Sequence, residues 1–279
     1  GTSPDYKCLE HDLLPPVLER IQTETSSASA QRAAFTVYGW LAKAVFVRMS
    51  NITLCEHMVG QLVQWLAHPV LRYQVAACFA DLVQDHPIAL TRASHANVKL
   101  LFRQRFFSMV VPQLIRGYEQ TTDSTDSTAF AQDPKAPYLL ALSHLIAHVP
   151  KQVLMTELPR VLPLLLSSFS LPNGDARATV ANTLYMVYMD DAAPLVPHTH
   201  SVISALLQLT DTRDRYNVMK VRMSALKCLA ILPSRQSYET IHPYKREVIQ
   251  TLSSVVDDHK RLVRHEAVVC RNRWYSASS

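Results

Sequence analysis

Apolar side chains recur along this chain at intervals of three and four residues, in one block after another. An early block places Ala34, Val37, Leu41, Ala44 and Val45 on one stripe. Such intervals bring side chains to the same side of an α-helix, where they can be buried together. The pattern predicts an all-α protein.

In the second half of the chain the apolar blocks come in pairs separated by short connections. The predicted pairs are 158–169 with 176–188, 198–209 with 218–232, and 243–256 with 261–275. Most of the sixteen prolines stand at the edges of apolar blocks, and Pro159 and Pro243 are expected where a helix begins or has just ended. Each pair predicts an antiparallel helical hairpin.

The second helix of each pair opens with an apolar residue followed by arginine. These arginines are Arg177, Arg222 and Arg264, and they are 45 and 42 residues apart. This period is typical of HEAT and armadillo repeats, which stack into α-solenoids. In the last pair Asp258 precedes Arg264 by six residues, and the other pairs are expected to lack such an aspartate. We expect hydrogen bonds between such an aspartate and arginine to fix the stacking of successive units.

A polar segment near 121–137 interrupts the helical period and is predicted to be a surface loop. The predicted organisation is a single HEAT/ARM-type α-solenoid over residues 4–275. Residues 1–3 are interpreted as a cloning remnant and residues 276–279 as a tail. The segment from 91 to 118 predicts a helix with an aromatic side and a basic side.

Composition agrees with a helical protein that needs no covalent staples. Hydrophobic residues make up 48% of the chain, and five glycines are too few for a protein rich in turns or phosphate-binding loops. The five cysteines are far apart, which indicates a reducing compartment. No apolar run is expected to be long enough to cross a bilayer.

The usual signatures of catalysis and of metal binding are absent from the sequence. It contains no glycine-rich phosphate loop, no nucleophile elbow, no zinc-protease motif and no cysteine pair at zinc spacing. His198 with His200, and Cys8 with His11, have ordinary structural interpretations. We therefore expect a protein that is not an enzyme and that holds no cofactor or metal.

The positive charge is concentrated near the C-terminal end. The segment 213–273 contains thirteen Lys and Arg and six Asp and Glu. Its net charge is therefore +7, compared with +5 for the whole chain. These cations either solvate the outer faces of the helices or line up into a ridge for an acidic partner. Trp274 is either an exposed aromatic anchor or a cap on the core. The predicted partner-binding residues are Lys220, Lys245, Arg246, Lys260, Arg261, Arg271, Arg273 and Trp274.

Four segments, 90–107, 137–166, 242–252 and 257–268, resemble a known family. They read LTRASHANVKLLFRQRFF, PYLLALSHLIAHVPKQVLMTELPRVLPLLL, HPYKREVIQTL and DDHKRLVRHEAV. They are similar to the C-terminal HEAT repeats of the large adaptor subunit of the cytosolic iron-sulfur protein assembly targeting complex, the methyl-methanesulfonate-sensitivity nineteen family. The end departs from the family, because Trp274-Tyr275 runs into Ser-Ala-Ser-Ser instead of apolar residues.

The resemblance implies a non-catalytic scaffold of cytosol and nucleus. Its implied partners are the small subunit and the WD-repeat propeller subunit of the targeting complex, together with apo iron-sulfur client proteins of DNA replication and repair. No membrane partner is implied, and direct nucleic-acid binding is the less favoured reading. The alternatives are another HEAT adaptor, such as a transport receptor, and a nucleic-acid-binding solenoid whose affinity would fall steeply with salt.

Overall fold

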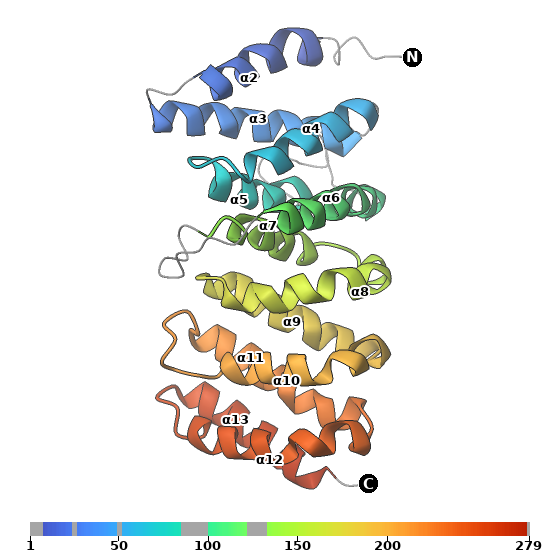
Figure 1. Ribbon diagram of the computed structural model, residues 1–279, viewed down its shortest axis with the longest axis vertical. Helices are drawn as coiled ribbons and strands as arrows, with labels where there is room; N and C mark the ends of the chain where they lie inside the picture. The colour runs from blue at the N-terminus through green and yellow to red at the C-terminus, as the bar shows by residue number, and fades with distance from the viewer. Residues whose placement is uncertain (1–7, 24–26, 49–51, 85–99, 122–132, 278–279) are drawn as a thin grey trace, which may run out of the picture. The chain divides into compact units, whose positions relative to one another are not determined.

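The computed structural model describes residues 8–23, 27–48, 52–84, 100–121 and 133–277. Within these ranges every regular element is a helix, which confirms the predicted all-α fold of the solenoid type (Figure 1). The elements are η1 (Leu9–Leu13), α2 (Leu14–Thr23), α3 (Ala28–Arg48), α4 (Ile52–Trp65), α5 (Arg72–Val83), α6 (Leu100–Gln120), α7 (Ala136–Ile146), α8 (Lys151–Ser167), η4 (Ser168–Ser170), α9 (Gly174–Asp190), η5 (Ala193–His198), α10 (Thr199–Gln208), α11 (Met219–Arg235), α12 (Tyr238–Val255) and α13 (Arg261–Ser276).

The chain divides into two compact units, residues 1–126 with 132–153, and residues 127–131 with 154–279. The single solenoid over residues 4–275 stays a prediction, and residues 1–3 lie outside the described residues. Residues 122–132 of the expected loop also lie outside them. The last residues of that loop are helical, because α7 begins at Ala136.

The first unit is held together by aromatic rings from several helices. Phe46 of α3 packs edge-on against Phe106 of α6 at a centroid distance of 5.0 Å, and Phe102 stacks on Phe106 at 5.6 Å. Phe79 of α5 lies 6.4 Å from Phe106. The aromatic side predicted for α6 is therefore part of the core, while Arg105 on the same helix is exposed.

The stripe predicted on α3 is partly wrong. Val37 is 49% exposed and Ala44 is exposed as well. The buried side instead carries Phe35, Tyr38 and Ala42, none of which is more than 1% exposed. The large rings determine which side of this helix faces inward, because they bury more apolar area than valine or alanine.

The second unit contains the three predicted hairpins. Helices α9, α11 and α13 pack in succession, α10 and α12 pack on α11 and α13, and α8 leads into α9 through η4 (Figure 1). The expected role of two prolines is wrong, since Pro159 lies inside α8 and Pro243 inside α12. Burial of Leu158 and Val161 on either side of Pro159 holds α8 together despite the missing backbone donor.

The stretch Lys151–Ser170 is long and apolar enough, at 20 residues, to cross a membrane by length and composition. The expectation that no run has this length is therefore wrong. The same test is passed by the core helix of a folded domain, and α8 buries six of its residues, including Leu154, Leu158 and Leu162. Its apolar side chains are accounted for by this packing.

Candidate functional site

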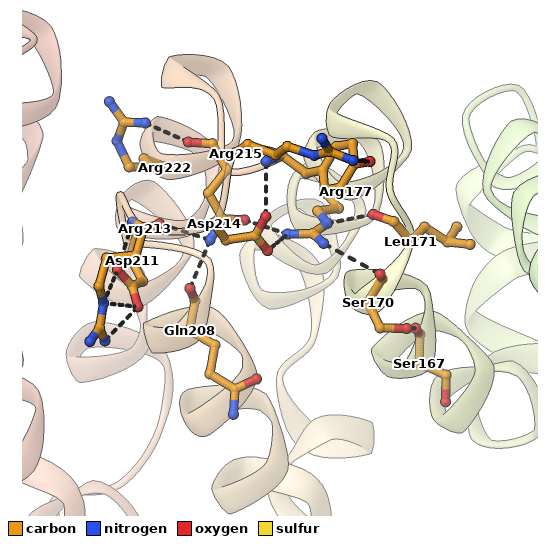
Figure 2. A network of polar contacts seen from close by, with 12 residues as sticks. Ser167, Ser170, Leu171, Arg177, Gln208, Asp211, Arg213, Asp214, Arg215 and Arg222 are labelled. Carbon is orange, nitrogen blue, oxygen red and sulfur yellow. Dashed lines mark hydrogen bonds and ion pairs between the residues drawn. The ribbon is translucent and has the colours of Figure 1, made fainter. Parts of the chain in front are cut away.

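A buried arginine joins each of two helical hairpins in the second unit to the next one. Arg177 of α9 is 5% exposed. Its Nε donates to the carbonyl oxygen of Leu171 at 2.7 Å, within its own hairpin. Its terminal nitrogen reaches forward to Asp214 Oδ2 at 2.5 Å and to Asn217 Oδ1 at 2.6 Å, both in the following turn (Figure 2).

The turn that receives Arg177 is itself tightly organised. The Asn217 side-chain amide donates to the carbonyl oxygens of Gln208 and Asp211, at 2.9 and 3.0 Å. The start of α9 approaches this turn so closely that a Cβ at Gly174 would lie 3.1 Å from the Tyr216 carbonyl oxygen. Glycine permits this contact between neighbouring hairpins.

The same arrangement recurs one unit later. Arg222 of α11 is 4% exposed, donates to the Asn217 carbonyl behind it, and contacts Asp258 ahead of it. The distance from Arg222 Nε to Asp258 Oδ2 is 2.8 Å, and the Asp258 side chain is fully buried. The predicted hydrogen bond between an aspartate and an arginine of successive units is confirmed.

Both carboxylates have their pKa lowered by these contacts. Burial of the Asp258 carboxyl would raise its pKa, but the Lys260 backbone N–H, 2.7 Å away, and the Arg222 guanidinium outweigh burial. At Asp214 burial is likewise outweighed, here by Arg177 and by the Tyr216 backbone N–H. Each aspartate is therefore ionised at neutral pH and attracts its arginine.

The expectation that only the last hairpin supplies such an aspartate is wrong. Asp214 lies eight residues before Arg222, whereas Asp258 lies six before Arg264. The turn carrying Asp214 places its carboxylate on Arg177 all the same. Sequence spacing missed it because the contact joins one hairpin to the next, 37 residues apart.

Arg264 of α13 is third in this series but is exposed. Its terminal nitrogen donates backward to the Asp258 carbonyl oxygen at 2.8 Å, as Arg177 and Arg222 do to their own turns. No carboxylate pairs with it among the residues that the structure describes. Arg264 thus makes the contact with its own turn, but within the described residues it lacks the contact with an aspartate of a following turn.

The predicted partner-binding residues fall into two groups at opposite ends of the last hairpin. Lys260 and Arg261 lie at the α12–α13 turn, on the same side as Lys220 at the start of α11. Arg273 lies twelve residues further along α13 than Arg261, which is a rise of about 18 Å along the helix axis. Arg271 lies beside Arg273. The helices therefore do not present all these cations as one continuous ridge.

The side chains in these two groups differ in whether they contact other residues of the chain. Lys220 Nζ lies 3.1 Å from Asp175, in an exposed pair. Lys245 donates to the carbonyl oxygens of Tyr275 and Ala277, at 3.1 and 2.7 Å, and so caps α13. Arg273 donates to the Ala230 carbonyl oxygen at 3.3 Å. Among the predicted partner-binding residues, Arg246, Lys260 and Arg261 are the exposed cations whose side chains make no hydrogen bond or ion pair with another residue in the described parts of the chain.

Trp274 is a core cap, and the expectation of an exposed anchor is wrong. Its side chain is 0% exposed, and its indole Nε1 donates to the Leu229 carbonyl oxygen at 2.9 Å. The same register carries Val263, Ala267 and Cys270, which are all fully buried. Their spacing of four, three and four residues was a sequence signal for this buried side.

The four buried cysteines, Cys55, Cys78, Cys228 and Cys270, are poor nucleophiles. Burial raises the pKa of Cys55 to about 11 and that of Cys78 to about 12, and it raises the pKa of Cys270 to about 12. These thiols stay protonated at neutral pH. Within the described ranges no three His, Cys, Asp or Glu side chains gather where they could hold a metal ion.

Comparison with known proteins identifies the family. A family model described as "RNAPII transcription regulator C-terminal" matches residues 5–233. The chain is 34% identical to the MMS19 nucleotide excision repair protein homolog of Xenopus tropicalis over 277 residues, which is 98% of this chain and 26% of that protein. The human homolog is 33% identical, over 96% of this chain and 24% of its own length.

More distant relatives agree. The DNA repair/transcription protein mms19 of Schizosaccharomyces pombe is 28% identical, over 90% of this chain and 23% of its own length. An engineered protein of known crystal structure shares the fold, with a TM-score of 0.56 at 14% identity, over 94% of this chain and 98% of its own. The chain thus spans about a quarter of the length of the curated relatives it matches. It belongs to the MMS19 family and corresponds to the C-terminal region of that family.

Proposed function

We propose that this chain is a non-catalytic protein-interaction scaffold of the cytosolic iron-sulfur targeting complex. It would dock the small subunit, beside the WD-repeat propeller subunit, and help to recruit apo iron-sulfur client proteins in cytosol and nucleus. Family membership supports this proposal, because relatives are named as nucleotide excision repair and DNA repair/transcription proteins. Several repair enzymes are of the client class that the resemblance implies.

The observation that carries the proposal is the exposed charge of the α12–α13 hairpin. Arg246, Lys260 and Arg261 are exposed, while Trp274 and the contact between Arg222 and Asp258 attach the hairpin firmly to α11. Solvated cations on a preorganised surface attract an acidic partner and speed its association. Polar side chains elsewhere in the unit, such as Arg177 and Asp214, are used in stacking.

The test is a calorimetric titration of the chain with the purified small targeting subunit. Reversal of Arg246, Lys260 and Arg261 to Glu should weaken binding by about tenfold or more, with helicity by circular dichroism unchanged. The control reverses Arg20, Arg32 and Arg105, three exposed arginines of the first unit, and changes net charge equally. Equal losses in both variants, or no binding by the unaltered chain, would contradict the proposal.

The same titration separates the alternatives. Binding of single-stranded or duplex DNA whose affinity falls steeply between 50 and 200 mM salt, roughly in proportion to the number of phosphates contacted, would favour a nucleic-acid-binding solenoid. A protein partner held by a few cations should show a much weaker salt dependence.

A further inference from the structure

One side of α13 corresponds to the side by which each of the preceding helices α9 and α11 packs on the next hairpin. Counted from the arginine that opens each helix, the positions 0, +4, +7 and +11 lie on one side of an α-helix within about 60°. In α9 these are Arg177, Ala181, Leu184 and Tyr188, and each is at most 5% exposed.

Helix α11 buries the first three of these positions, and the fourth, Pro233, is half-buried. Arg222, Leu226 and Leu229 are at most 4% exposed, and they face the hairpin that follows, where Arg222 meets Asp258 and the Leu229 carbonyl accepts from Trp274. These positions are therefore the contact by which one unit receives the next.

In α13 three of these four positions are exposed, and the remaining one, Arg271, is half-buried. The four are Arg264, Val268, Arg271 and Tyr275, which we call the α13 stripe. Arg264 is exposed, and Val268 and Tyr275 are 45% and 52% exposed. The surface combines apolar area with two cations, the composition that protein interfaces favour, because arginine and tyrosine contribute much of their binding energy.

The chemistry of position +7 indicates what covers the stripe. Leucine occupies it in α9 and α11, inside permanent stacks, whereas α13 carries Arg271 there. Arg271 donates to the Tyr275 hydroxyl at 3.2 Å, and its Nε is buried with no hydrogen-bond partner among the described residues. A partner that covers Arg271 also removes its charge from water, so the partner must supply an acceptor to the terminal nitrogens of the guanidinium.

We propose that the α13 stripe binds an acidic helical segment of a partner protein, with one carboxylate on Arg264 and a second on Arg271. The two arginines are seven residues apart, which is about 10 Å along the helix. Val268 lies between them and contacts an apolar side chain of the partner. The carboxylate on Arg264 takes the place that Asp214 has on Arg177 and Asp258 has on Arg222. This inference rests on the proposed function only in taking the chain to be a protein-binding scaffold.

The test uses two probes against the whole chain: the purified small targeting subunit, and a synthetic helical peptide with two aspartates seven residues apart and leucines between them. Reversal of Arg264 and Arg271 to Glu should weaken binding of the acidic peptide about tenfold or more. A control variant, Lys227→Glu with Arg235→Glu, reverses two exposed cations of α11 and should leave binding unchanged. A peptide with lysines in place of the aspartates should not bind.

The outcomes distinguish this inference from the proposed function. If the small subunit binds and the α13 variant binds it equally well, the inference is overturned while the proposed function stands. Binding of the acidic peptide alone, lost in the α13 variant, would support the inference and contradict the proposed function. If neither probe binds, both fail. Self-association of the chain that Arg264→Glu abolishes would assign the stripe to a second copy and overturn the assignment to a partner.

Discussion

At the scale of single residues, the same arginine position has two different roles in this chain. Arg222 is buried between two hairpins and is paired with the buried carboxylate of Asp258. Arg264, its counterpart one unit later, is exposed. The environment of each guanidinium, and not the residue type, decides whether it stabilises the fold or is free for a partner.

This difference predicts unequal costs of truncation. Arg222→Ala leaves the Asp258 carboxylate buried without its guanidinium and should destabilise the chain by about 3–5 kcal/mol. Arg264→Ala removes an exposed side chain and should cost less than about 1 kcal/mol. Urea unfolding of the two variants measures both values. Similar losses in the two would contradict the assignment of Arg222 as the stacking residue.

The lowered pKa of Asp258 and Asp214 predicts a dependence of stability on pH. Because these pKa values are lower in the folded chain than in the unfolded one, where about 3.9 is expected, the aspartates stabilise the fold above that value. The contribution is lost as pH falls through the folded pKa values. Urea midpoints between pH 7 and pH 3 should fall less in Asp258→Asn than in the unaltered chain. A parallel fall in both would mean that Asp258 contributes nothing to this dependence.

At the scale of elements, close contacts between helices depend on a few small or large side chains. A Cβ added at Gly117 of α6 would lie 2.5 Å from Cε1 of Tyr138 of α7, which is 5% exposed. Trp274 makes the opposite kind of contact, since its large ring fills the space between α13 and α11. Both contacts fix how neighbouring helices pack.

Gly117→Ala should therefore destabilise the first unit by about 1–3 kcal/mol, because Tyr138 has little room to move. The matched control is Gly60→Ala in α4, where nothing lies within 4 Å of the added Cβ. That change should stabilise the chain by about 0.5–1 kcal/mol through helix propensity. Thermal unfolding followed by circular dichroism compares them, and equal shifts of the same sign would refute the close approach.

Trp274→Ala should cost about 3–5 kcal/mol, since it empties a buried site at the contact of α13 with α11. Trp274→Phe keeps most of the apolar contact and loses the hydrogen bond to Leu229, so about 1–2 kcal/mol is expected. An exposed tryptophan would give a negligible change in both. Loss of blue-shifted emission in Trp274→Phe, compared with the unaltered chain that also contains Trp40 and Trp65, provides an independent check.

At the scale of the whole molecule, periodicity predicted the class of fold and the three hairpins of the second unit, because each helix buries one side. Helix ends were less predictable, since tertiary packing holds Pro159 and Pro243 inside helices. The burial of Trp274 was within reach of the sequence, from its register with Val263 and Cys270. The pairing of Asp214 with Arg177 was not, because a turn conformation decides where that carboxylate lies.

The sequence could not separate the exposed cations of the predicted site from those bound within the fold, for a similar reason. A count of cations finds the basic end of the chain, but it does not distinguish Lys245, which caps α13, from Arg246 beside it, which is exposed. The α13 stripe becomes visible only when exposure is compared at equivalent positions of three helices. Comparison of equivalent positions in the structure of successive helices, and not the sequence alone, identifies the stripe on α13 as the exposed one.

Hydrogen exchange of the chain with and without the purified small targeting subunit, read by mass spectrometry, tests the central claim most directly. The account predicts slower exchange of backbone amides in α12 and α13, residues 238–276, and unchanged exchange in α3 and α4 of the first unit. Protection confined to the first unit, or no change anywhere at saturating subunit, would contradict a scaffold that docks this partner through its last helical hairpin.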